Sequence, residues 1–202
     1  MFINSRFTQN AHQRGLTLIE LLVFIIVVSV AIVGVLAVLN FTVRHSADPL
    51  VRKQVIAIAE SILAEIEQQP FTFCDPDDPA AATAVNAAGC TTSQDNGGAA
   101  FSGPIPATES RYSATDPFDN VADYGGFTMP GGGCPNICLP GDTSGTGLTG
   151  YTVSVTITRV GATAQFPSVP LDAALRIDVL VNGPGNTAIT LTGYRTRYAP
   201  NI

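Results

Sequence analysis

An apolar run near the N-terminus constrains this chain more than any other feature. From Leu21 to Leu39 every one of 19 residues is apolar except Ser29 and Gly34. At about 1.5 Å per residue this run makes about 28 Å of helix, close to the thickness of a bilayer's hydrocarbon core. Its valines and isoleucines would favour a strand in water, but in lipid only a helix satisfies its own backbone groups. The run therefore predicts a single transmembrane helix.

The residues on either side of the run predict its orientation. Arg6 and Arg14 precede it, and the next basic residue is Arg44. This asymmetry predicts a cytoplasmic N-terminus and an exported C-terminal part. A cleaved secretory signal is the alternative, but its apolar core is usually about 7–15 residues long and ends at a small-residue cleavage site. Neither property fits, so the run indicates a retained anchor.

One carboxylate, Glu20, lies at the edge of the run. Such a group costs about 2.5–3.5 kcal/mol at the centre of a membrane and less near the interface, so an acid that reaches the headgroups is the ordinary interpretation. However, the segment Gly15 to Glu20 (GLTLIE) resembles the precursors of type IV pilins and of type II secretion pseudopilins. These have a short basic leader, a glycine, a hydrophobic residue and T-L-I-E. Leu16 stands where many members have phenylalanine or methionine.

The resemblance implies a processing site and an assembly contact. A prepilin peptidase would cut between Gly15 and Leu16, and the new amine of Leu16 would be N-methylated. Glu20 would then meet the positively charged Leu16 terminus of a neighbouring subunit. An unpaired charge in an apolar bundle costs several kcal/mol, which pairing with an ammonium group offsets. We therefore expect Glu20 to set the axial register between subunits.

The composition excludes several functional classes. The formal charge of the 202 residues is −6 and falls by two to −8 without the leader, and Lys53 is the only lysine. A nucleic-acid-binding patch and a polybasic lipid site are therefore not expected. There is no nucleophile elbow, P-loop or zinc-protease motif, and no pattern that places two carboxylates across a cleft. His12 lies in the leader and His45 beside the membrane, so we expect no enzyme and no cofactor.

A second helical pattern follows the apolar run. From Leu50 to Gln69 the apolar residues recur at helical spacing on one face, at Val51, Val55, Ile58, Ile62 and Ile66. The Asp48-Pro49 step predicts a kink or a new N-cap, and Pro70 ends the helix. A continuous helix from Leu16 to Gln69 would contain 54 residues and extend about 80 Å.

The C-terminal part alternates with a period of two residues. Tyr151–Val160, Leu175–Val181 and Thr187–Arg197 predict strands, with a turn at Asn182–Asn186. They indicate an antiparallel sheet with one apolar face, which suits packing against a helix. The stripe of Ile58, Ile62 and Ile66 is the expected partner.

Residues 71–150 are rich in turn residues and contain few periodic stretches. A region this long without regular structure is unusual in a compact domain, so we expect additional links to hold it in place. Four cysteines lie here on the exported side, where disulfides persist. Four cysteines allow three connectivities. We favour the one that closes two short loops, in which Cys74 is joined to Cys90 and Cys134 to Cys138. A zinc site is the weaker alternative, because there is no second close pair and no nearby histidine.

Two groups of acids in the same region are calcium candidates, Asp75, Asp77 and Asp78 and then Asp116, Asp119 and Asp123. Loop carboxylates suit calcium. Neither group has the spacing of a known calcium loop, and Asp-Pro steps often only begin turns. Asx turns with solvated carboxylates are therefore the favoured interpretation.

The segment Asp116 to Phe127 (DPFDNVADYGGF) resembles the F-D-N-V-x-D-Y segment of minor pilins of the mannose-sensitive haemagglutinin (MSHA) pilus, the MshD-like group. Those proteins have histidine or asparagine after the tyrosine, whereas this chain has Gly125. The residues from Asp48 to Glu60 are also similar to that group.

These observations predict an α+β, pilin-like fold in which a long N-terminal helix packs on a C-terminal antiparallel sheet, with a disulfide-pinned loop region between them. The expected parts are a leader at 1–15, a filament-core helix at 16–41, an amphipathic half at 42–70, loops at 71–150 and the sheet at 151–202. The expected function is a minor type IV pilin-like subunit, anchored first in the lipid of the bacterial inner membrane and then assembled with other subunits by the pilus machinery. A minor pseudopilin of type II secretion and an anchored adhesive or ligand-binding domain that never polymerises are the alternatives.

Overall fold

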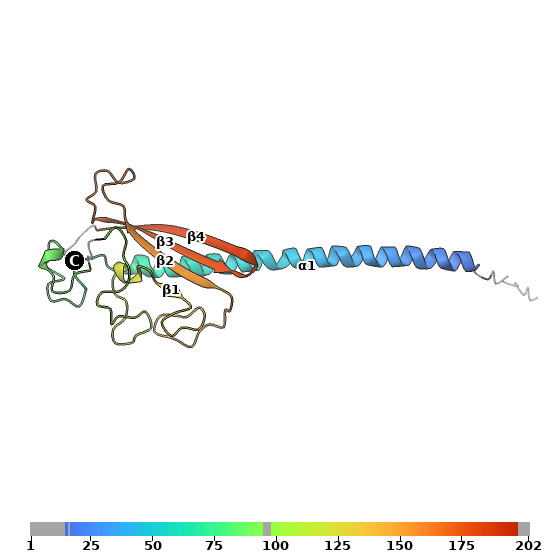
Figure 1. Ribbon diagram of the computed structural model, residues 1–202, viewed down its shortest axis with the longest axis horizontal. Coiled ribbons are helices and arrows are strands. Elements are labelled where there is room, and N and C mark those ends of the chain that lie inside the picture. The colour runs from blue at the N-terminus through green and yellow to red at the C-terminus, as the bar shows by residue number, and fades with distance from the viewer. Residues whose placement is uncertain (1–14, 16, 95–97, 198–202) are drawn as a thin grey trace, which may run out of the picture. The chain divides into compact units, whose positions relative to one another are not determined.

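The computed structural model describes residues 15, 17–94 and 98–197 (Figure 1). The leader residues 1–14 and Leu16 therefore lie outside the described residues. The chain divides into two compact units, Met1–Ala47 and Asp48–Ile202. The first contains the N-terminal part of helix α1 (Leu18–Gln68). The second contains the rest of α1, the loops and the strands.

Helix α1 begins directly after Thr17. The Thr17 carbonyl accepts a hydrogen bond from the Leu21 amide at 3.2 Å, and its hydroxyl oxygen accepts one from the Glu20 amide at 3.4 Å. These bonds satisfy amides that have no partner within the helix. Helix α1 continues through Pro49 to Gln68, so the new N-cap, one of the two outcomes expected at the Asp48-Pro49 step, was wrong. Pro70 follows the last turn, as expected.

Four antiparallel strands form one sheet in the order β1-β2-β3-β4. These are β1 (Thr128–Met129), β2 (Thr152–Arg159), β3 (Ala174–Gly183) and β4 (Thr187–Thr196). The last three confirm the strands expected from the alternating pattern. The connection between β3 and β4 is a short 3₁₀ helix, η3 (Pro184–Asn186), in which Gly185 has a φ of 68°. This positive φ suits glycine and explains the sharp turn.

The amphipathic part of α1 packs on the apolar face of this sheet (Figure 1). Val55, Ala59 and Ile66 are fully buried there. They belong to one core cluster with the inward-facing residues of two central strands, which are Val153, Val155 and Ile157 of β2 and Ile177, Val179 and Val181 of β3. Burial alternates along β2 and β3, as the period of two requires. The predicted α+β architecture is therefore confirmed.

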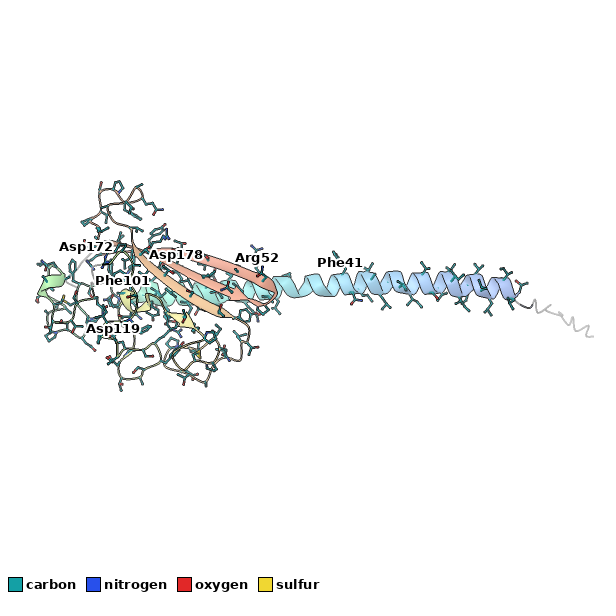
Figure 2. All side chains as sticks on the ribbon, viewed as in Figure 1. Phe41, Arg52, Phe101, Asp119, Asp172 and Asp178 are labelled. Carbon is teal, nitrogen blue, oxygen red and sulfur yellow. A yellow bond between two sulfur atoms is a disulfide. The ribbon has the colours of Figure 1, made fainter. Side chains whose placement is uncertain are left out.

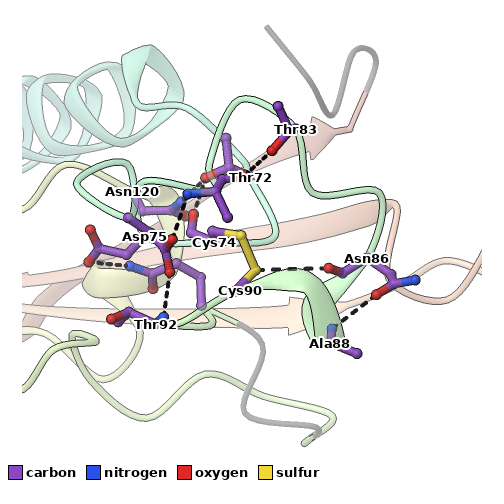
Figure 3. Close-up of a disulfide and its surroundings, with 12 residues drawn as sticks. Thr72, Cys74, Asp75, Thr83, Asn86, Ala88, Cys90, Thr92 and Asn120 are labelled. Carbon is purple, nitrogen blue, oxygen red and sulfur yellow. Dashed lines mark hydrogen bonds between the residues drawn. A yellow bond between two sulfur atoms is a disulfide. The ribbon is translucent and has the colours of Figure 1, made fainter.

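The loop region has little regular structure apart from two 3₁₀ helices, η1 (Ala87–Gly89) and η2 (Val121–Tyr124), and strand β1. Disulfides join Cys74 to Cys90 and Cys134 to Cys138. These are the two short-loop pairings favoured from the sequence. Figure 3 shows the first of them, beside which the Asn120 side chain reaches Thr72. Each disulfide limits the freedom of the unfolded loop.

A buried ion pair joins the helix to this loop region. The Arg111 guanidinium donates two hydrogen bonds to the Glu65 carboxylate, both at 2.7 Å. Tyr124 donates its hydroxyl to the same carboxylate at 2.8 Å, and Arg111 also donates to the Cys138 carbonyl at 2.9 Å. The Arg111 side chain is only 3% exposed. The pairing therefore satisfies charges that would be costly to bury alone.

We expect Arg111→Met to lower the free energy of unfolding by about 3–5 kcal/mol, because it leaves the Glu65 carboxylate without its cation. Replacing both partners with apolar residues (Arg111→Met with Glu65→Leu) should cost less than the single change. The measurement is urea unfolding of the full chain in detergent, with circular dichroism as the signal that monitors unfolding.

The matched control is Arg176→Met, which breaks the more exposed pair with Asp178. Surface pairs contribute less than about 1 kcal/mol. Equal losses from Arg111→Met and Arg176→Met would contradict the structural role of the buried pair.

Candidate functional site

The N-terminal part of α1 presents an unburied apolar surface. The 25 residues from Leu18 to Thr42 are long and apolar enough to cross a membrane, and within the described part of the chain no other helix meets that test. None of the most apolar stretch is buried inside the chain. Figure 2 shows the side chains projecting from this part of the helix, with Phe41 labelled. A surface of this kind requires lipid or other apolar helices around it.

The few polar side chains in this segment hydrogen-bond to the helix itself. Ser29 donates to the Ile25 carbonyl at 2.7 Å, and Asn40 and Thr42 donate to carbonyls four residues earlier at 3.0 and 2.9 Å. Local bonding to the preceding turn is a common solution for such residues. It keeps these donors satisfied where no water is available.

Gly15 and Glu20 are both exposed, whereas Leu16 lies outside the described residues. Glu20 belongs to the first turn of α1, where a negative charge interacts favourably with the helix dipole. Among the ion pairs of the described residues none involves Glu20. Its carboxylate is therefore available to a positive group from another chain.

Comparison with known proteins identifies this segment. Residues 10–36 match the family described as the prokaryotic N-terminal methylation motif. No curated protein and no solved structure matches the chain. The match supports a type IV pilin-like or pseudopilin-like prepilin, a structural class that is processed by prepilin peptidase and assembles with other pilins. The matched range does not reach the segment that resembles MSHA minor pilins.

That segment forms a capped turn in the second unit. Asn120 caps η2 by accepting a hydrogen bond from the Ala122 amide at 3.1 Å, and the Asp123 carboxylate accepts one from the Asn120 amide at 2.7 Å. This reciprocal arrangement is a capping box. Asp123, one of the calcium candidates, therefore has a structural partner for its carboxylate.

The glycine that departs from the MSHA pattern has a steric explanation. A Cβ atom at Gly125 would lie 2.5 Å from the Phe101 Cβ and 2.7 Å from the Phe101 carbonyl oxygen. Separations this short require the backbone of Phe101 to move. Any side chain after Tyr124 would therefore displace the neighbouring loop, and only glycine fits this arrangement.

The first acidic group forms Asx turns, as expected. The Asp75 carboxylate accepts a hydrogen bond from the Asp77 amide, and the Asp78 carboxylate accepts one from the Ala80 amide, both at 2.7 Å. Hydrogen bonds from the Thr92 and Ala80 amides hold the pKa of Asp78 below its usual value. However, Asp75 and Asp78 are buried, so the expectation of solvated carboxylates was wrong for these two residues.

The structure brings together a set of acids that the sequence did not group. Asp75, Glu109 and Asp119 each place a carboxylate oxygen within 4.8 Å of the other two, a geometry that could hold a metal ion. Asp116 and Asp123 do not belong to this set. Sequence reasoning missed Glu109 because it stands alone between Thr108 and Ser110. Only the folding of distant loops reveals it.

Burial and the charges of neighbouring acids raise the pKa values of Glu109 and Asp119, two members of this carboxylate set. Desolvation, followed by the neighbouring charge of Asp123, raises the pKa of Glu109 to about 10. Desolvation, followed by the charges of Asp75 and Asp123, raises the pKa of Asp119 to about 7. Desolvation also raises the pKa of Asp123. Without a cation, Glu109 therefore favours the protonated state in the folded chain at neutral pH.

We expect the metal-free chain to lose stability as the pH rises. Raised pKa values mean that the folded chain keeps protons that the unfolded chain releases above about pH 4. The contribution is therefore present at low pH and is lost as the pH passes through about 7 for Asp119 and toward about 10 for Glu109. The urea midpoint in detergent and chelator should be lower at about pH 8 than at about pH 5.

In this measurement Glu109→Gln should reduce the fall of the urea midpoint between about pH 5 and about pH 8, because the amide does not titrate. Asp142→Asn is the control: hydrogen bonds from Ser144 lower the pKa of Asp142, so its contribution changes only at more acidic pH. An unchanged decline in Glu109→Gln would show that this carboxylate set does not control the pH dependence.

Proposed function

We propose that this protein is a minor type IV pilin-like subunit that enters a filament through the N-terminal part of α1. The observation that carries the proposal is the methylation-motif match at residues 10–36, which overlaps the apolar helix surface of Leu18–Thr42 that the chain itself leaves unburied. A soluble domain has no use for such a surface, whereas a bundle of equivalent helices would cover it.

The proposed route begins in the inner membrane of a bacterium. The N-terminus faces the cytoplasm and the unit Asp48–Ile202 faces the periplasm, as the arginine asymmetry favours. Prepilin peptidase cuts between Gly15 and Leu16, and the pilus machinery then adds the subunit to a filament. The subunit serves there in priming, at the tip or as a sparse component, and it is not an enzyme. The oxidising periplasm is also consistent with the two disulfides.

The finer assignment to the MSHA minor pilins rests on the resemblance of residues 48–60 and 116–127. Asn120 and Asp123 of that segment form the capping box of η2, and the glycine at position 125 has a local steric reason. We therefore propose an MSHA-like minor pilin whose loop packing differs from the group at this position.

Two alternatives remain distinguishable by experiment. A minor pseudopilin of type II secretion shares the whole N-terminal argument, and its gene would lie beside secretion components instead of pilus components. An anchored domain that never polymerises would keep its leader and would not cross-link through the anchor. The processing prediction below separates the anchored domain that never polymerises from both the pilin and the pseudopilin.

We expect the native protein to begin at a methylated Leu16. Mass spectrometry of filaments should find no residues 1–15, and Gly15→Leu should retain the leader because it removes the glycine before the cut. Gly34→Ala is the matched control, since a Cβ at Gly34 meets nothing within 4 Å. Filaments in which residues 1–15 remain attached would exclude the proposed processing.

We further expect Glu20→Val to reduce incorporation into filaments by at least about tenfold, because the Leu16 ammonium of the neighbouring subunit would lose its partner. Quantitative immunoblotting of sheared filaments measures this, with membrane levels of the subunit for normalisation. Glu60→Gln, at an exposed position of α1, should leave incorporation unchanged. Normal incorporation of Glu20→Val would remove the register role.

A further inference from the structure

Three loop segments far apart in sequence converge on one set of carboxylates. Asp75 follows the disulfide-bonded Cys74, Glu109 lies in the middle of the loop region, and Asp119 immediately precedes the cap of η2. One oxygen from each lies within 4.8 Å of the other two. Figure 2 shows Asp119 among these loops, and Figure 3 shows Asp75 beside the disulfide. A ligand bound here would join all three segments.

Two buried oxygen atoms at this point have no hydrogen-bond partner and are therefore suited to coordinate a cation. Glu109 is 7% exposed, and its Oε2 atom has no hydrogen-bond partner. The Oδ1 atom of Asp119 is likewise buried without a partner. Because buried polar atoms are nearly always hydrogen-bonded, each exception requires an explanation. Both atoms belong to the converging carboxylates, so one cation would satisfy both.

A neutral side chain adds a second, independent observation. Gln94 is 1% exposed, and its Nε2 atom lies 3.4 Å from the Asp75 Oδ2 atom, which places its carboxamide at the edge of the carboxylate set. The same Nε2 atom donates to the Ile105 carbonyl. The Gln94 Oε1 atom, however, has no partner. A buried, unpartnered amide oxygen on a side chain that contacts one of these carboxylates is the type of ligand that hard cations bind.

Among the residues that the structure describes, no cationic side chain forms an ion pair with these carboxylates. The ion pairs of the described residues involve Glu65, Asp178 and Asp172, and none of them includes Asp75, Glu109 or Asp119. Arg111, the buried arginine of this region, is directed to Glu65 and the Cys138 carbonyl. Neighbouring carboxylates without a counter-charge repel one another strongly when shielded from water.

An ion could reach the carboxylates from solvent. A pocket of about 170 Å³ opens beside them. Five acids line this pocket, which are Asp75, Asp77, Asp78, Glu109 and Asp116. The rest of its wall is formed by Pro79, Thr91, Thr92 and Pro106. The negative wall would concentrate cations at its mouth. An entry path of this kind is expected of a functional metal site.

We propose that Asp75, Glu109 and Asp119 bind a calcium ion, with the Gln94 Oε1 atom and water completing the coordination. Calcium binds oxygen at about 2.3–2.6 Å, so two ligands of one ion can lie up to about 5 Å apart. Magnesium binds at about 2.0–2.1 Å and requires a tighter, octahedral set. Oxygens within 4.8 Å of one another can share one ion. Loops that supply a mixture of carboxylate and amide oxygens suit the flexible coordination of calcium better than the strict octahedron of magnesium.

The site has a structural role that does not depend on filament assembly. It would join residues 75, 109 and 119, which neither disulfide connects to one another. Calcium would therefore order the central loops, as the disulfides order the loops at residues 74–90 and 134–138. It would also neutralise the repulsion among the three carboxylates.

The test is thermal unfolding of the full chain in nonionic detergent, with chelator, with about 5 mM CaCl₂ or with the same concentration of MgCl₂. A site of the affinity usual for extracellular calcium modules should raise the melting temperature by about 5 °C in calcium. Isothermal titration calorimetry should find one calcium ion per chain. Magnesium should have a much smaller effect.

Glu109→Gln and Asp119→Asn should each abolish the calcium-dependent shift and the binding heat. Both variants replace a carboxyl group whose ionisation the metal-free fold disfavours, so their metal-free melting temperatures should equal or exceed that of the wild type, which shows that they are folded. Glu60→Gln should keep the full calcium response. The proposal is overturned if calcium does not stabilise the wild type, if magnesium stabilises it equally, or if either variant keeps the shift.

Discussion

The hydrogen bonds that the Glu65 carboxylate accepts are the polar contacts that connect helix α1 to the loop region of the second unit. Glu65 lies on α1 one position before the buried Ile66 of the stripe and accepts hydrogen bonds from Arg111 and Tyr124. Through Arg111 it also connects to the backbone of the Cys134–Cys138 loop. The apolar face of α1 packs on the sheet and also on loop residues such as Phe101, Val121 and Ile137. The Glu65 contacts add a specific, directional attachment to this apolar packing.

Much of this fold follows from local sequence patterns. The stripe of α1 and the alternation in β2, β3 and β4 each have a period that only one regular structure can satisfy. The short-loop disulfides also follow, because nearby cysteines on an exported chain find each other easily. The residues after Phe71 form mostly turns, as their glycines and prolines indicate. In these parts the local pattern of the sequence is enough to predict the type of each element.

The contacts between distant segments could not be predicted in this way. Arg111 and Glu65 are 46 residues apart, and neither stands in a pattern that names the other. Glu109 is an isolated acid in sequence, yet it meets Asp75 and Asp119 in the fold. The acidic groups that the sequence did show divide among Asx turns, a capping box and this shared set. Spacing along the chain could not distinguish these roles, because each depends on which loops meet.

The self-satisfied polar groups of the membrane-crossing part of α1 have an energetic consequence. The side chains of Ser29, Asn40 and Thr42 donate hydrogen bonds to carbonyl groups of the helix itself. The outer surface of the segment is therefore apolar, and lipid tails and other apolar helices are similar environments for it. Exchanging one for the other releases little hydrophobic free energy. Extraction from the bilayer would thus be almost isoenergetic for this segment. Its direction would have to come from the single acidic side chain at its edge and from work done by other proteins.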